Sequence, residues 1–250
     1  MIPLKSLRLK CLALLALPAL LGACAVTPPP NQLGAISDET RAMYAATVDN
    51  GFEVPAIEDK YLSEYRKRQL VPYHAPYKAG TIVVDPGGRF LYHLKGDETA
   101  MRYLIAVGAQ GYGFSGEATI PFQRDWPYWT PTANMLRREP EEYGPVRNGL
   151  PGGLENPLGA RALYLYKNGR DTLYRIHGTP SPWTVGHGTS SGCIRMFNQD
   201  VIHLAEQVEN GTKVVVLTKE EAGKWTDGSE TPPLVAMAGE DATGAAPSEG

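Results

Sequence analysis

Residues 176–196 read IHGTPSPWTVGHGTSSGCIRM and combine the end of an apolar stretch with a glycine-rich loop. His177 lies at the start of this segment, sixteen residues before Cys193. A cysteine becomes a nucleophile when a nearby base removes its proton. Gly192 lets backbone N–H groups approach a substrate oxygen, as an oxyanion hole requires. The pattern predicts a site in which a strand end holds the base and a loop carries the nucleophilic thiol.

Short apolar strands and turns surround this segment on both sides. The Asn168-Gly169 pair predicts a tight hairpin, and the counts of 27 Gly, 21 Pro and 13 Tyr favour a turn-rich, strand-rich chain. The predicted strands are residues 81–84, 89–94, 102–107, 162–166, 172–176 and 213–217. One helix is predicted before the last strand, with Asn198 as its cap, Gly211 as its stop and apolar Val201, Leu204, Ala205 and Val208 at helical spacing.

The composition of the 250 residues limits the class of protein. A hydrophobic content of 42% with 20% charged residues is typical of a chain that buries a core. The net charge of −3 leaves no basic surface of the kind that binds nucleic acid, so no nucleic-acid partner is expected. Three cysteines are too few for a disulfide scaffold.

The first 23 residues have the pattern of an export signal. Three basic residues precede an uncharged apolar run from Cys11 to Leu21, which is too short for a membrane span. Leu21-Gly22-Ala23-Cys24 resembles the bacterial lipobox, whose cysteine is acylated and becomes the mature N-terminus; the alternative is an ordinary signal peptide that ends at a cysteine by chance. Removal of residues 1–23 changes the net charge from −3 to −6 and leaves Cys193 as the one thiol without lipid.

Three further regions flank or interrupt the predicted domain. Residues 24–77 are expected to be a tether and a helical extension that begins near Ser37, with a charged, solvated helix or arm at 60–69. Residues 220–250 are predicted to be a disordered tail. The long insert at 120–159 favours either a lid over the site or a small satellite core around Trp126 and Trp129.

Residues 78–219 resemble the L,D-transpeptidase (YkuD) catalytic domain of bacterial cell-wall enzymes. That family has a histidine, about fifteen residues, then Ser/Thr-His-Gly-Cys followed by an apolar residue and Arg or Asn. The positions that match are His177, Gly178, Ser190, Gly192, Cys193 and Arg195, whereas Ser191 stands where the family most often has histidine. The resemblance implies a mainly β fold, a mixed-sheet sandwich or partial barrel with a few short helices.

The resemblance also implies a reaction that needs no cofactor. The Cys193 thiolate would attack the carbonyl of the L-centre of diaminopimelate in a peptidoglycan tetrapeptide stem and release D-Ala. The thioester would then pass to an amine of a second stem or of an envelope protein. His177 would act as the base, and the Gly178 carbonyl is expected to accept its imidazole N–H because no Asp or Glu is adjacent.

Several residues keep two interpretations at this stage. Arg195 suits a carboxylate clamp on the substrate or an ion pair within the loop. Thr179, Ser190 and Ser191 suit hydrogen bonds to the loop backbone or to the substrate. His187 either replaces the imidazole missing at Ser191 or is an exposed loop histidine. A metal site is not expected, because zinc requires three or four ligands at short spacings and one thiol is present.

Other functions remain open on the sequence alone. The same thioester could pass to water, as in an L,D-carboxypeptidase or amidase, or to a protein amine, as in a sortase-like anchoring enzyme. A non-catalytic peptidoglycan-binding lipoprotein is the third alternative, and the intact His177 and Cys193 pair argues against it. Ala25 follows Cys24 where an Asp often signals inner-membrane retention, so we expect a lipid anchor in the outer membrane, facing the periplasm.

Overall fold

The computed structural model describes residues 36–108, 114–189 and 193–228. Within these ranges one large mixed sheet dominates, and a small antiparallel hairpin, β1 (Thr47–Asp49) with β2 (Phe52–Val54), stands apart from it. In spatial order the large sheet runs β12 (Gly188–Thr189), β7 (Ala106–Gly108), β13 (Ile194–Arg195), β11 (Arg170–His177), β10 (Arg161–Lys167), β8 (Gly116–Ile120), β14 (Thr212–Val216), β4 (Ile82–Asp85), β5 (Phe90–Gly96), β6 (Thr99–Leu104) and β3 (Gln69–Pro72), with β9 (Gln123–Asp125) paired to β10.

The helices in the described ranges are short. They are α1 (Asp38–Met43), α2 (Ala133–Arg138), α3 (Pro140–Tyr143) and α4 (Asn198–Ala205), with 3-10 turns η1 (Asp59–Tyr61), η3 (Pro182–Thr184) and η4 (Lys219–Glu221). The pairs β11–β13, β14–β4 and β12–β7 are parallel and the other pairs are antiparallel, so the predicted mainly β, mixed-sheet architecture with a few short helices is confirmed. Across the described residues, no helix has the length and apolar character needed to cross a membrane.

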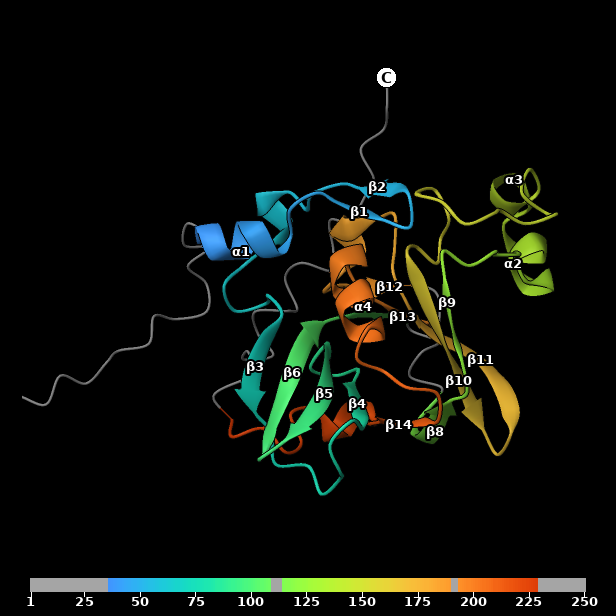
Figure 1. Cartoon of the computed structure of the whole chain (residues 1–250). Helices are drawn as coiled ribbons and strands as arrows, with labels where there is room; N and C mark the ends of the chain where they lie inside the picture. The colour runs from blue at the N-terminus through green and yellow to red at the C-terminus, as the bar shows by residue number, and fades with distance from the viewer. Residues whose placement is uncertain (1–35, 109–113, 190–192, 229–250) are drawn as a thin grey trace, which may run out of the picture.

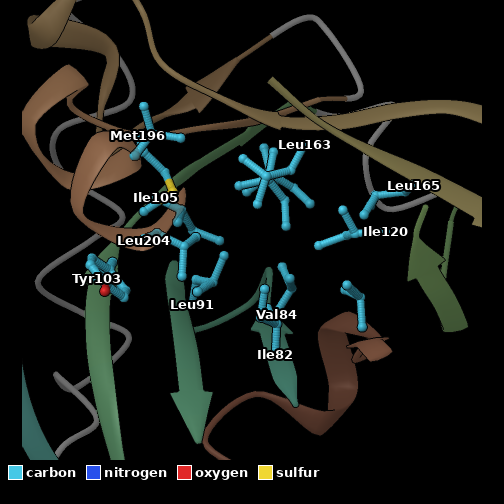
Figure 2. Packing of buried hydrophobic residues seen from close by; sticks show 14 of the residues in the cluster. Ile82, Val84, Leu91, Tyr103, Ile105, Ile120, Leu163, Leu165, Met196 and Leu204 are labelled. Atoms are coloured by element: carbon cyan, nitrogen blue, oxygen red, sulfur yellow. The ribbon is translucent and has the colours of Figure 1, made fainter. Parts of the chain in front are cut away.

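Apolar side chains are buried on both faces of the sheet, which explains why β4 is apolar at consecutive positions. Ile82 and Val84 belong to the cluster drawn in Figure 2, whereas Val83 between them belongs to a second cluster. In Figure 1, α4 stands between the β4–β6 side of the sheet and the β10–β11 hairpin. Leu204 of α4 is fully buried in the first cluster, and burying a side chain of this kind stabilises the fold by about 1.5–3 kcal/mol.

The predicted capping of α4 is wrong. Phe197 occupies the cap position, Asn198 is the first helical residue, and the helix ends at Ala205. The Asn198 amide binds the backbone of neighbouring segments, so it is not free to cap the helix. Gly211, with φ +91°, turns the chain into β14, where its N–H donates to the Ile120 carbonyl at 2.7 Å.

The predicted solvated helix or arm at 60–69 is also corrected by the structure. The segment forms the η1 turn and bends, and Gln69 begins β3 at the edge of the large sheet. Arg68 is not a solvated charge, because its Nη1 lies 3.1 Å from Oδ1 of the fully buried Asp200. Helix α1 does begin where the sequence predicts, with the Ser37 hydroxyl accepting from the Thr40 N–H.

The first residues of the predicted disordered tail make contacts with the domain. Gly223 donates its N–H to Asp85 at 2.7 Å, and the Trp225 ring packs edge-on against Tyr73 and Tyr77. The prediction of disorder is therefore wrong for residues 220–228. Residues 229–250, the predicted leader at 1–23 and Cys24 lie outside the described residues.

The insert at 120–159 contains β9, α2 and α3. Trp126 is 8% exposed, stacks on Phe52 at 4.1 Å between ring centroids and donates its indole N–H to Asp49 at 2.6 Å. Trp126 is therefore part of a satellite core that joins the insert to the β1–β2 hairpin. Trp129 lies elsewhere in the insert, 6.1 Å from the Tyr143 ring.

Candidate active site

The predicted base ends strand β11, and the predicted nucleophile directly precedes the neighbouring parallel strand β13. The register places Ile176 opposite Ile194 and His177 opposite Arg195. Both isoleucines are buried in the core. Because side chains alternate between the faces of a strand, His177 and Arg195 lie on the face opposite these isoleucines. Cys193, directly before β13, interacts electrostatically with Arg195. The β11–β13 pairing thus sets His177 opposite a residue that lies two positions after Cys193.

His177 is held as a neutral imidazole with a defined proton position. Its Nδ1 lies 2.6 Å from the Gly178 carbonyl oxygen, and its side chain is buried. A carbonyl oxygen only accepts hydrogen bonds, so Nδ1 carries the proton and Nε2 keeps its lone pair. Burial, with a smaller contribution from the charge of Arg195, lowers the pKa of His177 to about 3. The ring is therefore an uncharged proton acceptor at neutral pH.

Cys193 is half-buried, with its Sγ 4.0 Å from the Leu173 carbonyl oxygen. Burial raises the pKa of the thiol above its usual range, while the Arg175 backbone N–H and the charges of Arg175 and Arg195 act in the opposite direction. The thiol is thus protonated in the resting protein. Cys193 and the neutral His177 therefore carry no charge at neutral pH.

The strand next to the thiol contains a backbone bulge that the sequence does not predict. The β10–β11 register shifts between Tyr164 and Tyr166, and Leu173, opposite this shift, adopts φ +65° with its side chain 72% exposed. The Asp171 carboxylate accepts from the Leu173 N–H at 2.8 Å and supports this conformation. Residues 172–176 read as a regular strand because nothing in the sequence signals a positive φ at a leucine.

Arg195 and the insert meet on the same side of the molecule. Burial lowers the pKa of Arg195, and the interactions with Cys193 and with Tyr143 of α3 oppose this shift. Burial and Glu142 raise the pKa of Tyr143 to about 12, with Arg195 acting against them. Tyr143 therefore lies within electrostatic reach of Arg195, and α3 borders the site. The sequence placed α3 in a long irregular insert and provided no signal for this residue.

Thr179 forms hydrogen bonds with its own loop and with α4. Its hydroxyl accepts from the Ser181 N–H at 3.1 Å, and its carbonyl accepts from the Asn198 side chain at 3.1 Å. His187 is half-buried in the loop between η3 and β12. The predicted residues Ser190, Ser191 and Gly192 lie outside the described residues. Within the described ranges, no group of three His, Cys, Asp or Glu side chains is placed to hold a metal ion.

Comparison with known proteins identifies the domain. The family model of the YkuD L,D-transpeptidase catalytic domain matches residues 79–216. The chain is 30% identical over 184 residues to the probable L,D-transpeptidase ErfK/SrfK of Salmonella typhimurium, covering 71% of this chain and 58% of that protein. It is 34% identical over 170 residues to the putative L,D-transpeptidase YkuD of Bacillus subtilis, covering 68% and 76%. A third relative, the probable L,D-transpeptidase YbiS of Escherichia coli, is 35% identical over 137 residues, or 54% of this chain and 43% of that protein.

The chain thus spans about half the length of the first two enterobacterial relatives, ErfK/SrfK and YbiS. Among solved structures, a Brucella melitensis protein described as a probable carnitine operon oxidoreductase is 51% identical, with a TM-score of 0.44 over 63% of this chain and 98% of that one. An Enterococcus faecium L,D-transpeptidase mutant is 16% identical, with a TM-score of 0.39 over 56% and 50%. Both TM-scores are below 0.5, so the family assignment does not depend on them.

The segment matched by the family model contains the β11–β13 pairing, His177 and Cys193. It covers more than half of the 250 residues, and the relatives in Salmonella typhimurium and Bacillus subtilis are both described as L,D-transpeptidases. The family predicted from residues 176–196 is confirmed: this chain belongs to the YkuD family of L,D-transpeptidase catalytic domains.

Proposed function

We propose that this protein is a peptidoglycan L,D-transpeptidase with Cys193 as nucleophile and His177 as general base. The observation that carries the proposal is the β11–β13 register, which sets His177 opposite Arg195, two residues after Cys193. The Nδ1 contact with Gly178 supports it further, because this contact leaves Nε2 as the proton acceptor. Family membership supports peptidoglycan stem peptides as the substrate class.

The first half-reaction is acylation of the thiol. Nε2 of His177 takes the thiol proton as sulfur attacks the carbonyl carbon of the L-centre of diaminopimelate. The carbon–sulfur bond forms and the amide bond to the terminal D-Ala breaks. His177 returns the proton to the departing amine, so D-Ala leaves neutral and the stem remains as a thioester on Cys193. A neutral resting pair fits this sequence, since the proton moves during attack and is back on a product at the end.

The second half-reaction transfers the acyl group. An amine attacks the thioester carbon, His177 accepts a proton from that amine, and the proton passes to the departing sulfur of Cys193. The product is a new amide bond, made without ATP because the thioester conserves the energy of the first amide. The acceptor is a second stem peptide, which gives a 3-3 cross-link, or an amine of an envelope protein.

Two further contacts with substrate belong to the proposal. Arg195, half-buried on the same face as His177, is the carboxylate clamp for the stem peptide. Its register position opposite His177 supports this role, because a bound carboxylate would then lie beside the reacting carbonyl. The backbone N–H groups near Gly192 are the oxyanion donors, a role supported by the position of this glycine directly before the nucleophile.

The decisive experiment is mass spectrometry of wall fragments after purified protein is incubated with disaccharide-tetrapeptides. Dimers linked between two diaminopimelate residues, with one D-Ala lost per link, are expected. Tripeptides without dimers would indicate that the protein is an L,D-carboxypeptidase and not a transpeptidase. No change in the fragments, with folded protein, would indicate a non-catalytic wall-binding protein. Cys193→Ala serves as the control that must produce neither product.

We also propose that the protein is exported and held by lipid on Cys24, in the outer membrane and facing the periplasm. The apolar run before Leu21-Gly22-Ala23-Cys24 supports export, and Ala25 supports the outer membrane. Cys24→Ala is expected to abolish labelling by palmitate in cells that express the full chain. Labelling that persists in this variant would place the lipid elsewhere.

A further inference from the structure

We propose that Asn198 is a positioning residue that holds the His177 imidazole in its Nδ1–H form through the backbone of Gly178 and Thr179. The proposal rests on the function proposed above, since it concerns the base of that reaction. Asn198 does not contact the thiol, and it would act through the peptide groups that follow His177.

The Asn198 amide joins two segments that are far apart in the sequence. Its Oδ1 accepts the Ala160 N–H at 3.0 Å, and its Nδ2 donates to the Thr179 carbonyl at 3.1 Å. Both hydrogen bonds are buried, and Asn198 is 6% exposed. One side chain at the start of α4 therefore fixes the residue before β10 to the loop after β11.

Two glycines make room for this amide. A Cβ at Gly178 would lie 2.2 Å from the Asn198 Oδ1, and a Cβ at Gly159 would lie 2.3 Å from it. No real side chain tolerates such distances, so both backbones approach the amide closely because they are glycine. Asn198 is thus packed directly against Gly178, the residue whose carbonyl accepts the proton of His177 Nδ1.

The contact with the Gly178 carbonyl favours the proton on Nδ1 of His177. This carbonyl belongs to the peptide group between Gly178 and Thr179, and Asn198 fixes the next carbonyl along the chain. Rotation of that segment would break the 2.6 Å contact with Nδ1 and release the ring to its other tautomer. With the proton on Nε2, the nitrogen that takes the thiol proton would no longer be an acceptor.

The neighbouring residue in α4 provides a matched control. Gln199 is also buried and also carries an amide, but its Nε2 donates to Pro55 at 2.8 Å and to Ala45 at 3.4 Å, both in the N-terminal extension. Gln199→Ala therefore removes a buried amide from the same helix turn without touching the segment after His177. A purely structural effect of losing such an amide would be common to both positions.

The first readout is ¹⁵N NMR of the imidazole in protein labelled at histidine, with the His177 signal assigned by its loss in His177→Gln. Wild type and Gln199→Ala are expected to show the Nδ1–H form of His177. Asn198→Ala is expected to show the Nε2–H form or a mixture of the two. An unchanged Nδ1–H signal in folded Asn198→Ala would overturn the proposal, whatever the reaction catalysed.

The second readout is the rate of Cys193 acylation by a carbapenem, followed by intact-protein mass at several pH values. Asn198→Ala is expected to be acylated about 10- to 100-fold more slowly than wild type at every pH, while Gln199→Ala stays within about threefold. Asn198→Asp should be slow at pH 8 and should recover as the pH falls. Its protonated carboxyl has both an acceptor for Ala160 and a donor for Thr179, whereas the carboxylate has no donor.

Other groups titrate nearby in all variants, among them Asp200 in the same helix and His177 itself, so each profile is expressed as a ratio to wild type at the same pH. If Asn198→Ala does not fold, Asn198→Asp decides the question: a ratio that does not rise at low pH overturns the proposal. A failure of the proposed function has a different signature, namely acylation that continues in Cys193→Ala.

Discussion

Cys193 and His177 have complementary resting states, set by burial and not by an ion pair. Burial keeps the thiol protonated and the imidazole neutral. A thiolate–imidazolium pair would place charge on both of these partly or fully buried side chains, where charge is costly. The proton is therefore expected to move only as a carbonyl carbon comes within reach of sulfur.

Cys193→Ala and Cys193→Ser are expected to lose turnover while the fold survives, because Cys193 is the one thiol of the described residues, is half-buried directly before β13 and forms no disulfide. Removal of a covalent path costs several kcal/mol of activation free energy, so activity should fall below about a hundredth of wild type. The measurements are cross-linked fragments by mass spectrometry and a thermal melt. Activity above that level in folded Cys193→Ala would contradict the nucleophile assignment.

The two histidines of the loop region should differ in their effects. His177→Ala is expected to slow acylation about as much as loss of Cys193, because nucleophile and base act as one unit. His187→Ala should cost less than about tenfold, since this residue lies in the loop between η3 and β12. Carbapenem acylation measured by intact mass tests both variants. Fast acylation of His177→Ala with slow acylation of His187→Ala would reverse the roles and indicate that His187 compensates for Ser191.

At the scale of elements, the bulge in β11 determines what faces the thiol. The β10–β11 hairpin is otherwise regular on both sides of the register shift, from Ala162 paired with His177 to Lys167 paired with Arg170. At the shift the chain takes up extra residues, and the Leu173 carbonyl comes to 4.0 Å from Sγ. A residue in the left-handed region costs of order 1–3 kcal/mol unless it is glycine, so the fold retains this strain beside the Cys193 thiol.

Substitutions at Leu173 test that interpretation. Leu173→Gly is expected to keep acylation within about threefold and to leave stability within about 1 kcal/mol, because glycine adopts φ +65° freely and the exposed side chain buries little surface. Leu173→Val should slow acylation and destabilise by about 1 kcal/mol or more, since a β-branched residue resists positive φ. Chemical denaturation and acylation kinetics measure the two effects. Equal behaviour of the two variants would show that the bulge conformation is irrelevant to the thiol.

At the scale of the whole molecule, the N-terminal extension and the catalytic domain share one core. Tyr44 of the extension donates its hydroxyl to Asp200 at 3.2 Å, and Arg68 pairs with the other carboxylate oxygen. These contacts join residues more than 130 positions apart at the start of α4, the helix that carries Asn198. The extension therefore supports the element that orients the loop after His177.

Buried neutral histidines should make the folded protein sensitive to acid. Burial lowers the pKa of His93 and His203 to about 4 and that of His177 to about 3, against an unfolded value of 6.5. Between these values the unfolded chain binds more protons, so the stability is fully present above about pH 6.5 and is lost as the pH falls toward 4. Burial raises the pKa of Asp200 to about 7, although the charge of Arg68 lowers it. The folded protein therefore binds one more proton at Asp200 than the unfolded chain does as the pH falls, which offsets part of the loss of stability from the histidines.

The expected result is a free energy of unfolding that falls by about 1–2 kcal/mol per pH unit between pH 6.5 and 5, less than a full two-proton slope because solvent screens the half-exposed His203. Urea unfolding at a series of pH values measures this slope. His203→Gln should make the slope shallower by roughly one proton, since its ring then no longer titrates. A stability that is constant or rises toward pH 5 would contradict the neutral buried state of these histidines.

The family and the mainly β class could be predicted from residue type and spacing alone, and the same segment predicts the His177 and Cys193 pair as the reactive groups. These features depend on local signals: a compact motif in residues 176–196, apolar strands between turns, and an Asn168-Gly169 hairpin. Such signals survive without any knowledge of tertiary contacts, because residue type and spacing carry them. The start of α1 at Ser37 was predictable for the same reason.

Contacts between residues that are far apart in the sequence could be found only in the three-dimensional structure. The residue type and position of Asn198 predict a helix cap, yet its side-chain amide forms hydrogen bonds with the backbone of Ala160 and Thr179. The charged neighbours of Arg68 predict a solvated side chain, yet its guanidinium pairs with the carboxylate of Asp200, 132 positions away. A side chain's hydrogen-bond partner is chosen by the packing of whole elements, and no local pattern records which segment the fold will bring beside it.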